Sequence, residues 1–238
     1  GEKNSDRYEY ILPNIMYGKT FFTEKLGKID LRSNVIYTSY DTNKQKTFLT
    51  NDIIWNPLSF ISKNGFISSL EGMIRNENYE SQKTNEFKDD RTINEINGVI
   101  GYKASLPMKK DTLGKYSNLF SPNFMLRYAP GHMRNLKTKD VSFNHSNLYA
   151  LNKTSSIEDG LSAILGIDFQ INEKNNKAER EKFSISVGQV FNYEKNDDMP
   201  SKSSLDQEMS DVVGVINYNF SEIGKINYEF ALDHNLND

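Results

Sequence analysis

The most informative feature of the sequence is an alternation of apolar and polar residues that recurs along the chain. From Leu161 to Ile171 every odd position is apolar, whereas the even positions include Ser162, Asp168 and Gln170. Successive side chains of a β-strand point to opposite faces, so a period of two predicts strands with one apolar and one polar face. The pattern therefore predicts an all-β fold.

The same alternation is found upstream and downstream of this segment. It recurs in 29–38, 66–75, 96–106, 120–128, 183–193, 212–220 and 226–232. Segments 8–16 and 47–58 are noisier, because each has apolar residues on both faces and contains a proline, Pro13 or Pro57. A proline removes a donor from the hydrogen-bonded ladder. Together these segments predict about ten long antiparallel strands.

The lengths of the strands and of their connections favour a membrane-spanning sheet. Strands such as 161–171 match the about 9–11 residues of a tilted transmembrane strand, whereas soluble strands usually have about 5–6. Connections 24–28, 62–65, 173–181 and 221–225 are short, and 78–92, 131–159 and 194–211 are long and hydrophilic. Short turns at one end and long loops at the other are typical of outer-membrane barrels. Two connections break the alternation, since 41–45 is short and 107–118 is long.

Charged residues in the middle of predicted strands fall on the polar face. A water-filled lumen accommodates such charges, whereas bilayer hydrocarbon does not. We expect these residues to face the lumen: Glu71, Arg75, Lys103, Arg127, Asp168 and Glu229. We expect these apolar residues to face lipid: Leu165, Ile167, Phe169, Ile185, Val187, Tyr228 and Phe230. The fold predicted from the pattern is an incomplete antiparallel transmembrane β-barrel.

Two other readings of the pattern stay open at this point. A soluble β-sandwich, for example a carbohydrate-binding or hydrolytic module, also has alternating strands, but it buries their apolar faces against a second sheet. A passive diffusion porin has the same barrel wall and differs in what it encloses. The position of the apolar side chains in a structure separates the sandwich from the barrel.

Composition excludes several classes of protein. Apolar residues make up 37% of the 238 residues and aromatic residues 12%; disordered chains are poor in aromatics, so plain disorder is excluded. The net charge of −3 provides no broad basic field for nucleic acid. No apolar run approaches the about 20 residues of a membrane-spanning helix. The absence of cysteine excludes disulfides and thiol chemistry within the chain.

Motifs for metal binding and catalysis are absent from the sequence. His132, His145 and His234 are far apart and have no acidic neighbour at metal-ligand spacing. The chain has no glycine-rich phosphate loop and no Gly-x-Ser-x-Gly nucleophile elbow. We therefore expect no catalytic residues, no metal site and no cofactor.

An ordered set of motifs occurs in segments 120–130, 140–143, 147–149, 157–160, 165–167, 181–191, 217–218 and 228–229, with a weaker match at 8–13. In these segments the sequence resembles the LptD family of LPS-assembly outer-membrane proteins, also called organic solvent tolerance proteins. The motif positions within these segments are Pro122, Tyr128, Pro130, Asp140, Phe143, Asp159, Gly160, Gly166, Gly188 and Gln189. The resemblance is strongest at 181–191. It departs from the family at 153–156, where a Gly-Asp-Arg-like turn is usual.

The resemblance implies a fold, a function and partners. It implies that residues 1–238 form one partial barrel domain, an internal part of a barrel of about 26 strands in the family, without the strands of the lateral gate. The implied role is transfer of lipopolysaccharide (LPS) to the outer leaflet of a Gram-negative outer membrane, without chemistry. The implied partners are LPS, the bilayer, the plug lipoprotein LptE and the periplasmic bridge protein LptA.

Overall fold

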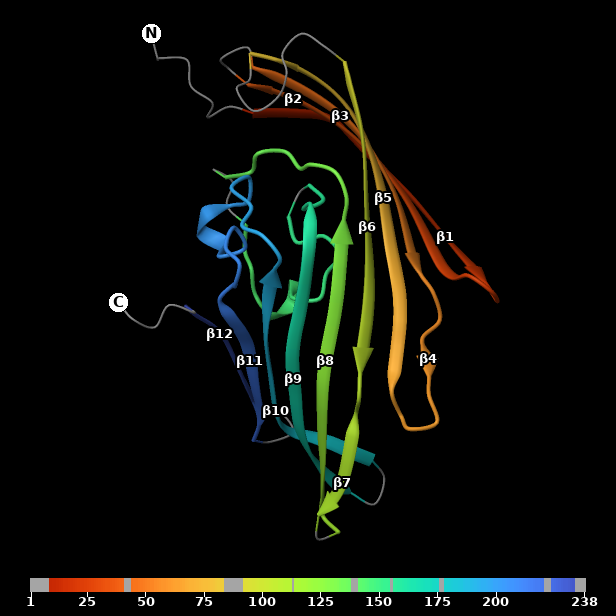
Figure 1. The fold of residues 1–238 in the computed structure, drawn as a ribbon, viewed down its shortest axis with the longest axis vertical. Helices are drawn as coiled ribbons and strands as arrows, with labels where there is room; N and C mark the ends of the chain where they lie inside the picture. The colour runs from red at the N-terminus through yellow and green to blue at the C-terminus, as the bar shows by residue number, and fades with distance from the viewer. Residues whose placement is uncertain are drawn as a thin grey trace. The chain divides into compact units, whose positions relative to one another are not determined.

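A computed structural model describes residues 9–40, 44–83, 92–112, 114–137, 141–154, 156–175, 178–220 and 224–233 (Figure 1). Contacts between Cα atoms divide the chain into two compact units. Unit 1 contains residues 1–58 and 71–99, and unit 2 contains residues 59–70 and 100–238. Each unit is described by itself below.

The structure contains twelve strands. They are β1 (Glu9–Thr23), β2 (Gly27–Tyr40), β3 (Gln45–Asn56), β4 (Phe60–Ile61), β5 (Ile67–Gln82), β6 (Ile93–Ser105), β7 (Met108–Thr112), β8 (Tyr116–Ala129), β9 (Gly160–Asn175), β10 (Ala178–Asn192), β11 (Val212–Asn219) and β12 (Lys225–Leu232). Two 3₁₀ turns, η1 (His145–Asn147) and η2 (Ser201–Ser203), lie in the connections after β8 and β10. No helix among these residues is long and apolar enough to cross a membrane.

The predicted all-β class and antiparallel pairing are confirmed. The strands form one sheet in the order β1-β2-β3-β5-β6-β8-β9-β10-β11-β12, with β4 paired to β5 and β7 paired to β8 off this path. The ten strands of the path correspond to the ten that the pattern predicts. All of the described strands belong to this sheet, so the described chain lacks the second sheet that a β-sandwich requires.

Unit 1 shows how the two prolines of the noisy segments are accommodated. Pro13 lies in β1, where the register with β2 shifts between Ile11 and Asn14. Such a bulge leaves a residue outside the ladder, so the missing N–H of the proline costs no hydrogen bond. Pro57 follows directly after the end of β3 at Asn56.

Several predicted connections differ from the structure in length. The predicted loop 78–92 begins too early, because β5 continues in register with β3 as far as Gln82. The predicted connection 173–181 is shorter than expected, because β9 and β10 remain paired up to Asn175 and Ala178. The long connection 107–118 contains β7, which forms a hairpin with β8. These strand ends have polar residues on both faces, so they lack the apolar–polar alternation from which the strands were predicted.

Candidate functional site

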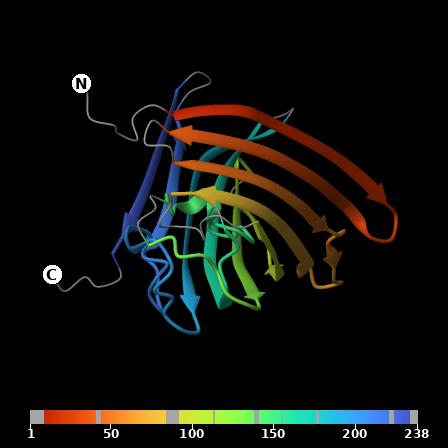
Figure 2. The same ribbon diagram turned by 90° about the horizontal axis from the view of Figure 1, so that it is seen from above.

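The two faces of β8, β9 and β10 in unit 2 differ in what covers them. In β9, Leu165 and Ile167 are 50% and 49% exposed, whereas Ser162 and Ile164 are 6% and 0% exposed. The first long connection, in its described residues 131–137, 141–154 and 156–159, and the second, residues 193–211, pack against the face that carries Ser162 and Ile164, which we call the inward face. In Figures 1 and 2 these segments are the green trace after β8 and the blue trace after β10, which lie next to each other.

A row of apolar side chains crosses the inward face. Met125 of β8 pairs with Ile164 of β9, and Ile164 pairs with Val190 of β10. All three are buried, at 0%, 0% and 2% exposure. Because paired residues of neighbouring strands point to the same face, this row forms a continuous apolar strip within an otherwise polar surface.

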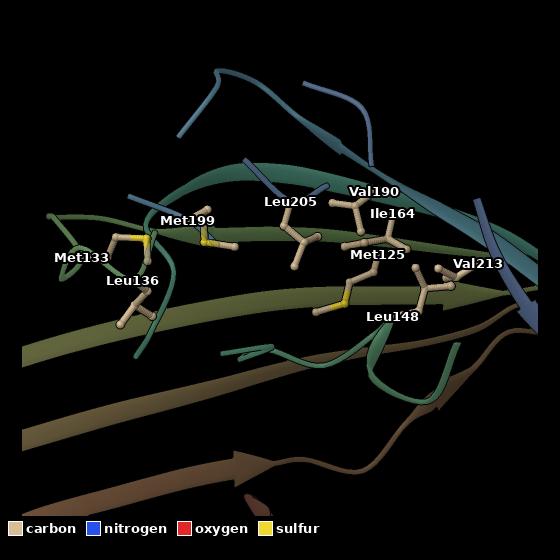
Figure 3. Close-up of a cluster of buried hydrophobic side chains, with 9 residues drawn as sticks. All are labelled: Met125, Met133, Leu136, Leu148, Ile164, Val190, Met199, Leu205 and Val213. Atoms are coloured by element: carbon tan, nitrogen blue, oxygen red, sulfur yellow. The ribbon is translucent and has the colours of Figure 1, made fainter. Parts of the chain in front are cut away.

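The two long connections cover this strip and form a small core with it (Figure 3). Met133, Leu136 and Leu148 come from the first connection, and Met199 and Leu205 from the second. Leu136 N donates a hydrogen bond to Asp198 O at 2.7 Å, which joins the two connections directly. The two connections therefore fold together onto the sheet.

Two glycines explain how closely the first connection approaches the sheet. Gly166 of β9 and Gly188 of β10 are paired residues on the inward face. A Cβ atom on Gly166 would collide with the hydroxyl of Tyr149, and one on Gly188 would collide with the side chain of Leu148. The lack of side chains at this pair therefore makes room for the Leu148–Tyr149 step of the connection.

A buried ion pair fixes the end of the same connection. Arg127 of β8 and Glu158 have side chains that are 3% and 7% exposed, and Nη2 of the arginine lies 3.0 Å from Oε2 of the glutamate. Arg127 also donates to Leu151 O and to Glu158 O, both at 2.6 Å. Three hydrogen bonds to one guanidinium compensate for the cost of burying its charge.

The other oxygen of Glu158 binds the backbone at Lys153 and Thr154. Oε1 accepts hydrogen bonds from the backbone N–H groups of Lys153 and Thr154, both at 2.6 Å. Thr154 Oγ1 donates to Ser156 O at 2.6 Å. The backbone of Lys153 and Thr154 therefore binds the same carboxylate that Arg127 binds from the strand side.

Side-chain amides of three residues help to hold the second connection. Asn196 donates to Asp159 Oδ1 at 2.5 Å, which links it to the end of the first connection. Gln189 Nε2 donates to Ser210 O at 2.6 Å. Asn192 Nδ2 donates to Gln207 O at 2.7 Å and to Leu205 O at 3.1 Å. Two strand residues and one loop residue thus hold the backbone of 193–211.

Two hollows flank the packed connections. One, of about 490 Å³, lies where β8, β9 and β10 meet the connections, and its lining includes Arg127, Glu158, Asp159, Asn192 and Asn196. Arg127 binds Glu158, Asn196 binds Asp159, and Asn192 binds the backbone of the second connection, so these groups already hold the connections to the sheet.

The second hollow, of about 370 Å³, lies on the other side of the Leu148–Tyr149 step. Polar side chains from β6, β8, β9 and the first connection line it: Lys103, Ser105, Asn123, His145, Tyr149 and Asp168. Asn123 Nδ2 donates to Asp168 Oδ2 at 2.7 Å. Burial, and to a smaller extent the charge of Asp168, raises the pKa of the Tyr149 hydroxyl, so that this group stays protonated and can donate a hydrogen bond.

The six residues expected to face the lumen are placed as follows. In unit 2 all four of these residues lie on the inward face: Arg127, Asp168, Lys103 and Glu229. Lys103 pairs with the inward-facing Met125. Glu229 is in the same cross-strand row as Asp168, since Asp168 pairs with Ser186, Ser186 with Val215, and Val215 with Glu229. In unit 1, Arg75 binds both carboxylate oxygens of Asp52 at 2.7 and 2.8 Å. Glu71 lies on the same face of β5 as Arg75 and the buried Met73. Whether water fills the space in front of them stays a prediction.

The residues expected to face lipid lie on the opposite, outward face. Leu165, Ile167 and Tyr228 are exposed. The register places the others in the same rows: Phe169 pairs with Ile185, Ile167 with Val187, and Gly214 with both Val187 and Phe230. Contact of this face with lipid also stays a prediction.

The motif positions mostly support the connections. Asp159, Gly166, Gly188 and Gln189 make the contacts given above. Gly160 has φ = +98°, a conformation that favours glycine, at the start of β9. Phe143 packs against the apolar core, Pro122 and Tyr128 lie in β8, and Pro130 directly follows it. Asp140 lies outside the described residues, as does His234.

Within the described ranges, no group of three or more His, Cys, Asp or Glu residues is arranged to hold a metal ion.

The sequence analysis missed the apolar row on the inward face. Ile164 and Val190 interrupt the polar face of their strands, which is the signal that could have identified it.

Two comparisons with known proteins complete the description. The family model described as "LptD: LPS transport system D" matches residues 9–238. No curated protein matches the chain.

Proposed function

Because the chain belongs to the LptD family of LPS transport proteins, we propose that it forms part of a transmembrane β-barrel that delivers LPS to the outer leaflet of a Gram-negative outer membrane. The observation that carries this proposal is the family match, which extends over residues 9–238. The chain would act as one part of a single barrel domain.

The two faces of the sheet suit the two parts of an LPS molecule. The outward face offers exposed apolar side chains, which hydrocarbon solvates without loss of hydrogen bonds. The inward face carries charged and amide side chains, which can replace water around a sugar headgroup. In the proposed path the acyl chains stay in apolar surroundings, the sugars pass along the inward face, and the lipid leaves through a lateral gate.

The proposal includes two protein partners by family resemblance. The plug lipoprotein LptE would occupy the lumen, and the periplasmic bridge protein LptA would supply LPS at the turn end of the strands. The role is one of transport, and no described side chain needs to take part in a covalent step.

Photo-crosslinking in the full-length protein in living cells tests the proposal. A photoreactive amino acid would replace Gln170, on the inward face, or Ile167, on the outward face, and adducts would be detected with an antibody against LPS. Resident outer-leaflet LPS can also reach the outward position, so each position is compared before and after LPS synthesis is blocked.

The expected result is an LPS adduct at Gln170 that disappears when supply stops, while any adduct at Ile167 persists. Absence of an adduct at the inward position during active supply contradicts the proposal. Ion conductance of the purified barrel without its partners, together with that absence, would favour the porin alternative.

A further inference from the structure

The hollow of about 370 Å³ beside Tyr149 has the features of a ligand site. It is separate from the Arg127–Glu158 and Asp159–Asn196 contacts that hold the connections. It falls within the range of about 300–1,000 Å³ that is typical of small-molecule pockets. All of its lining residues belong to unit 2. The Gly166–Gly188 pair lets Tyr149 lie directly against Gly166. The pocket is the space beside Tyr149 that Asn123 and Asp168 line.

Asp168 is prepared to accept further hydrogen bonds. The only protein hydrogen bond of its carboxylate among the described residues comes from Asn123 Nδ2 to Oδ2, at 2.7 Å. An ionised carboxylate has about four acceptor positions. Asn123 holds this group in place, since it also donates to Ser121 O at 3.2 Å, and Asp168 is one of the residues that line the pocket.

The remaining lining groups complement this acceptor. Within the described chain the Tyr149 hydroxyl makes no hydrogen bond, and it stays protonated as a donor. Ser105 offers a hydroxyl group, and Ile67 and the ring of Tyr149 add apolar and aromatic surface. A carboxylate and hydroxyls beside aromatic and apolar surface match a ring that carries several hydroxyl groups on one side and C–H groups on the other.

We propose that this pocket, formed by Asn123, Tyr149 and Asp168, binds a sugar ring of the LPS headgroup on the turn side of the folded connections. This inference rests on the proposed function, because it names the part of the transported molecule that the inward face holds. The location fits the direction of transport. A molecule that enters from the turn end of the strands meets Asp168 before it meets the apolar core at Ile164.

The test uses the purified full-length protein in detergent and the core oligosaccharide released from LPS by mild acid hydrolysis. Binding is followed by saturation-transfer difference NMR, in which only a bound sugar receives magnetisation from the protein. The variants are Asp168→Asn, which keeps an acceptor for Asn123, and Ser105→Phe, which fills the pocket. Asn172→Ala is the matched control, on the same face of β9 but outside the pocket lining.

We expect a Kd for the oligosaccharide that rises about tenfold or more in Asp168→Asn, since a hydrogen bond to a charged acceptor is lost. Ser105→Phe should abolish binding, and Asn172→Ala should leave the Kd unchanged. The absence of saturable binding to the unsubstituted protein would overturn the proposal. Equal Kd values in all variants would overturn it as well.

The outcomes separate this inference from the proposed function. If the sugar does not bind here but Gln170 still forms supply-dependent LPS adducts, the pocket is wrong and the transport role stands. If the oligosaccharide binds but no inward position forms adducts in cells, the pocket is a sugar site in a protein with another role.

Discussion

Arg127 of β8 and Glu158, at the end of the first long connection, form a buried ion pair with 3.0 Å between Nη2 and Oε2. The glutamate binds two backbone N–H groups of its own turn with its other oxygen. This pair therefore joins the fold of the connection to the sheet, and its loss should release the connection without unfolding the strands.

Arg127→Met should weaken this attachment by about 3–5 kcal/mol, because it leaves the Glu158 carboxylate buried without its cation. Hydrogen–deuterium exchange of the amides at 151–158 in the full-length protein measures the change. The double variant Arg127→Met with Glu158→Gln should lose less than the single variant, since no uncompensated charge remains. A double variant as weak as the sum of the two singles would argue that each residue acts alone.

Gly166→Ala should displace the Leu148–Tyr149 step. The added Cβ would collide with the Tyr149 hydroxyl and lie 2.8 Å from Val187 O. Amide exchange at 145–151 should rise, and Tyr149→Phe in the same chain should restore part of the protection. Gly98→Ala is the control, since its nearest neighbour outside the local chain is Met73 O at 3.8 Å. Equal effects at the two glycines would contradict the proposed contact.

Ile164→Ala should destabilise both connections together, because Ile164 lies at the centre of the row that they cover. Truncation of a buried isoleucine costs about 2–5 kcal/mol. Exchange should rise in 131–137, 141–154 and 193–211 at once, whereas the neighbouring Leu165→Ala, on the exposed face, should leave these segments unchanged. Faster exchange in only one of the two connections would show that they fold independently.

Leu165→Arg and Asp168→Asn should differ in their effect on membrane stability. An arginine on the lipid face near the middle of the bilayer costs about 2–4 kcal/mol, whereas a neutral amide on the inward face costs little. Denaturant unfolding of the full-length protein in lipid vesicles measures both. Equal losses of unfolding free energy would count against the assignment of the two faces.

The strands could be predicted from the sequence because their signal is local. Alternation identifies the face of each residue, and the register then places Leu165 and Ile167 outward and Asp168 inward, as the odd and even positions predict. The short strands β4 and β7 were missed, since two to five residues carry too little of the pattern.

The fold of the long connections could not be predicted, because it depends on pairs far apart in the chain. Asp159 meets Asn196, and Leu136 meets Asp198, only after the strands have brought the two connections together. Arg127 was expected to face the lumen as a solvated charge. In the structure it lies on the inward face, but the connection covers it, and its partner Glu158 lies 31 positions along the chain.

The most direct test asks whether alternate residues of these strands face lipid on the outward side and the water-filled lumen on the inward side. The chain has no cysteine, so, once cysteines elsewhere in the full-length protein are replaced, a single cysteine at each position from Leu161 to Ile171 can carry a spin label in the protein in its membrane. Accessibility of the label to oxygen, which concentrates in lipid, and to a water-soluble nickel chelate is then measured. We expect labels at Leu165, Ile167 and Phe169 to be more accessible to oxygen, and labels at Asp168 and Gln170 to be more accessible to the nickel chelate. Equal accessibility along β9, or the reverse preference, would contradict this expectation.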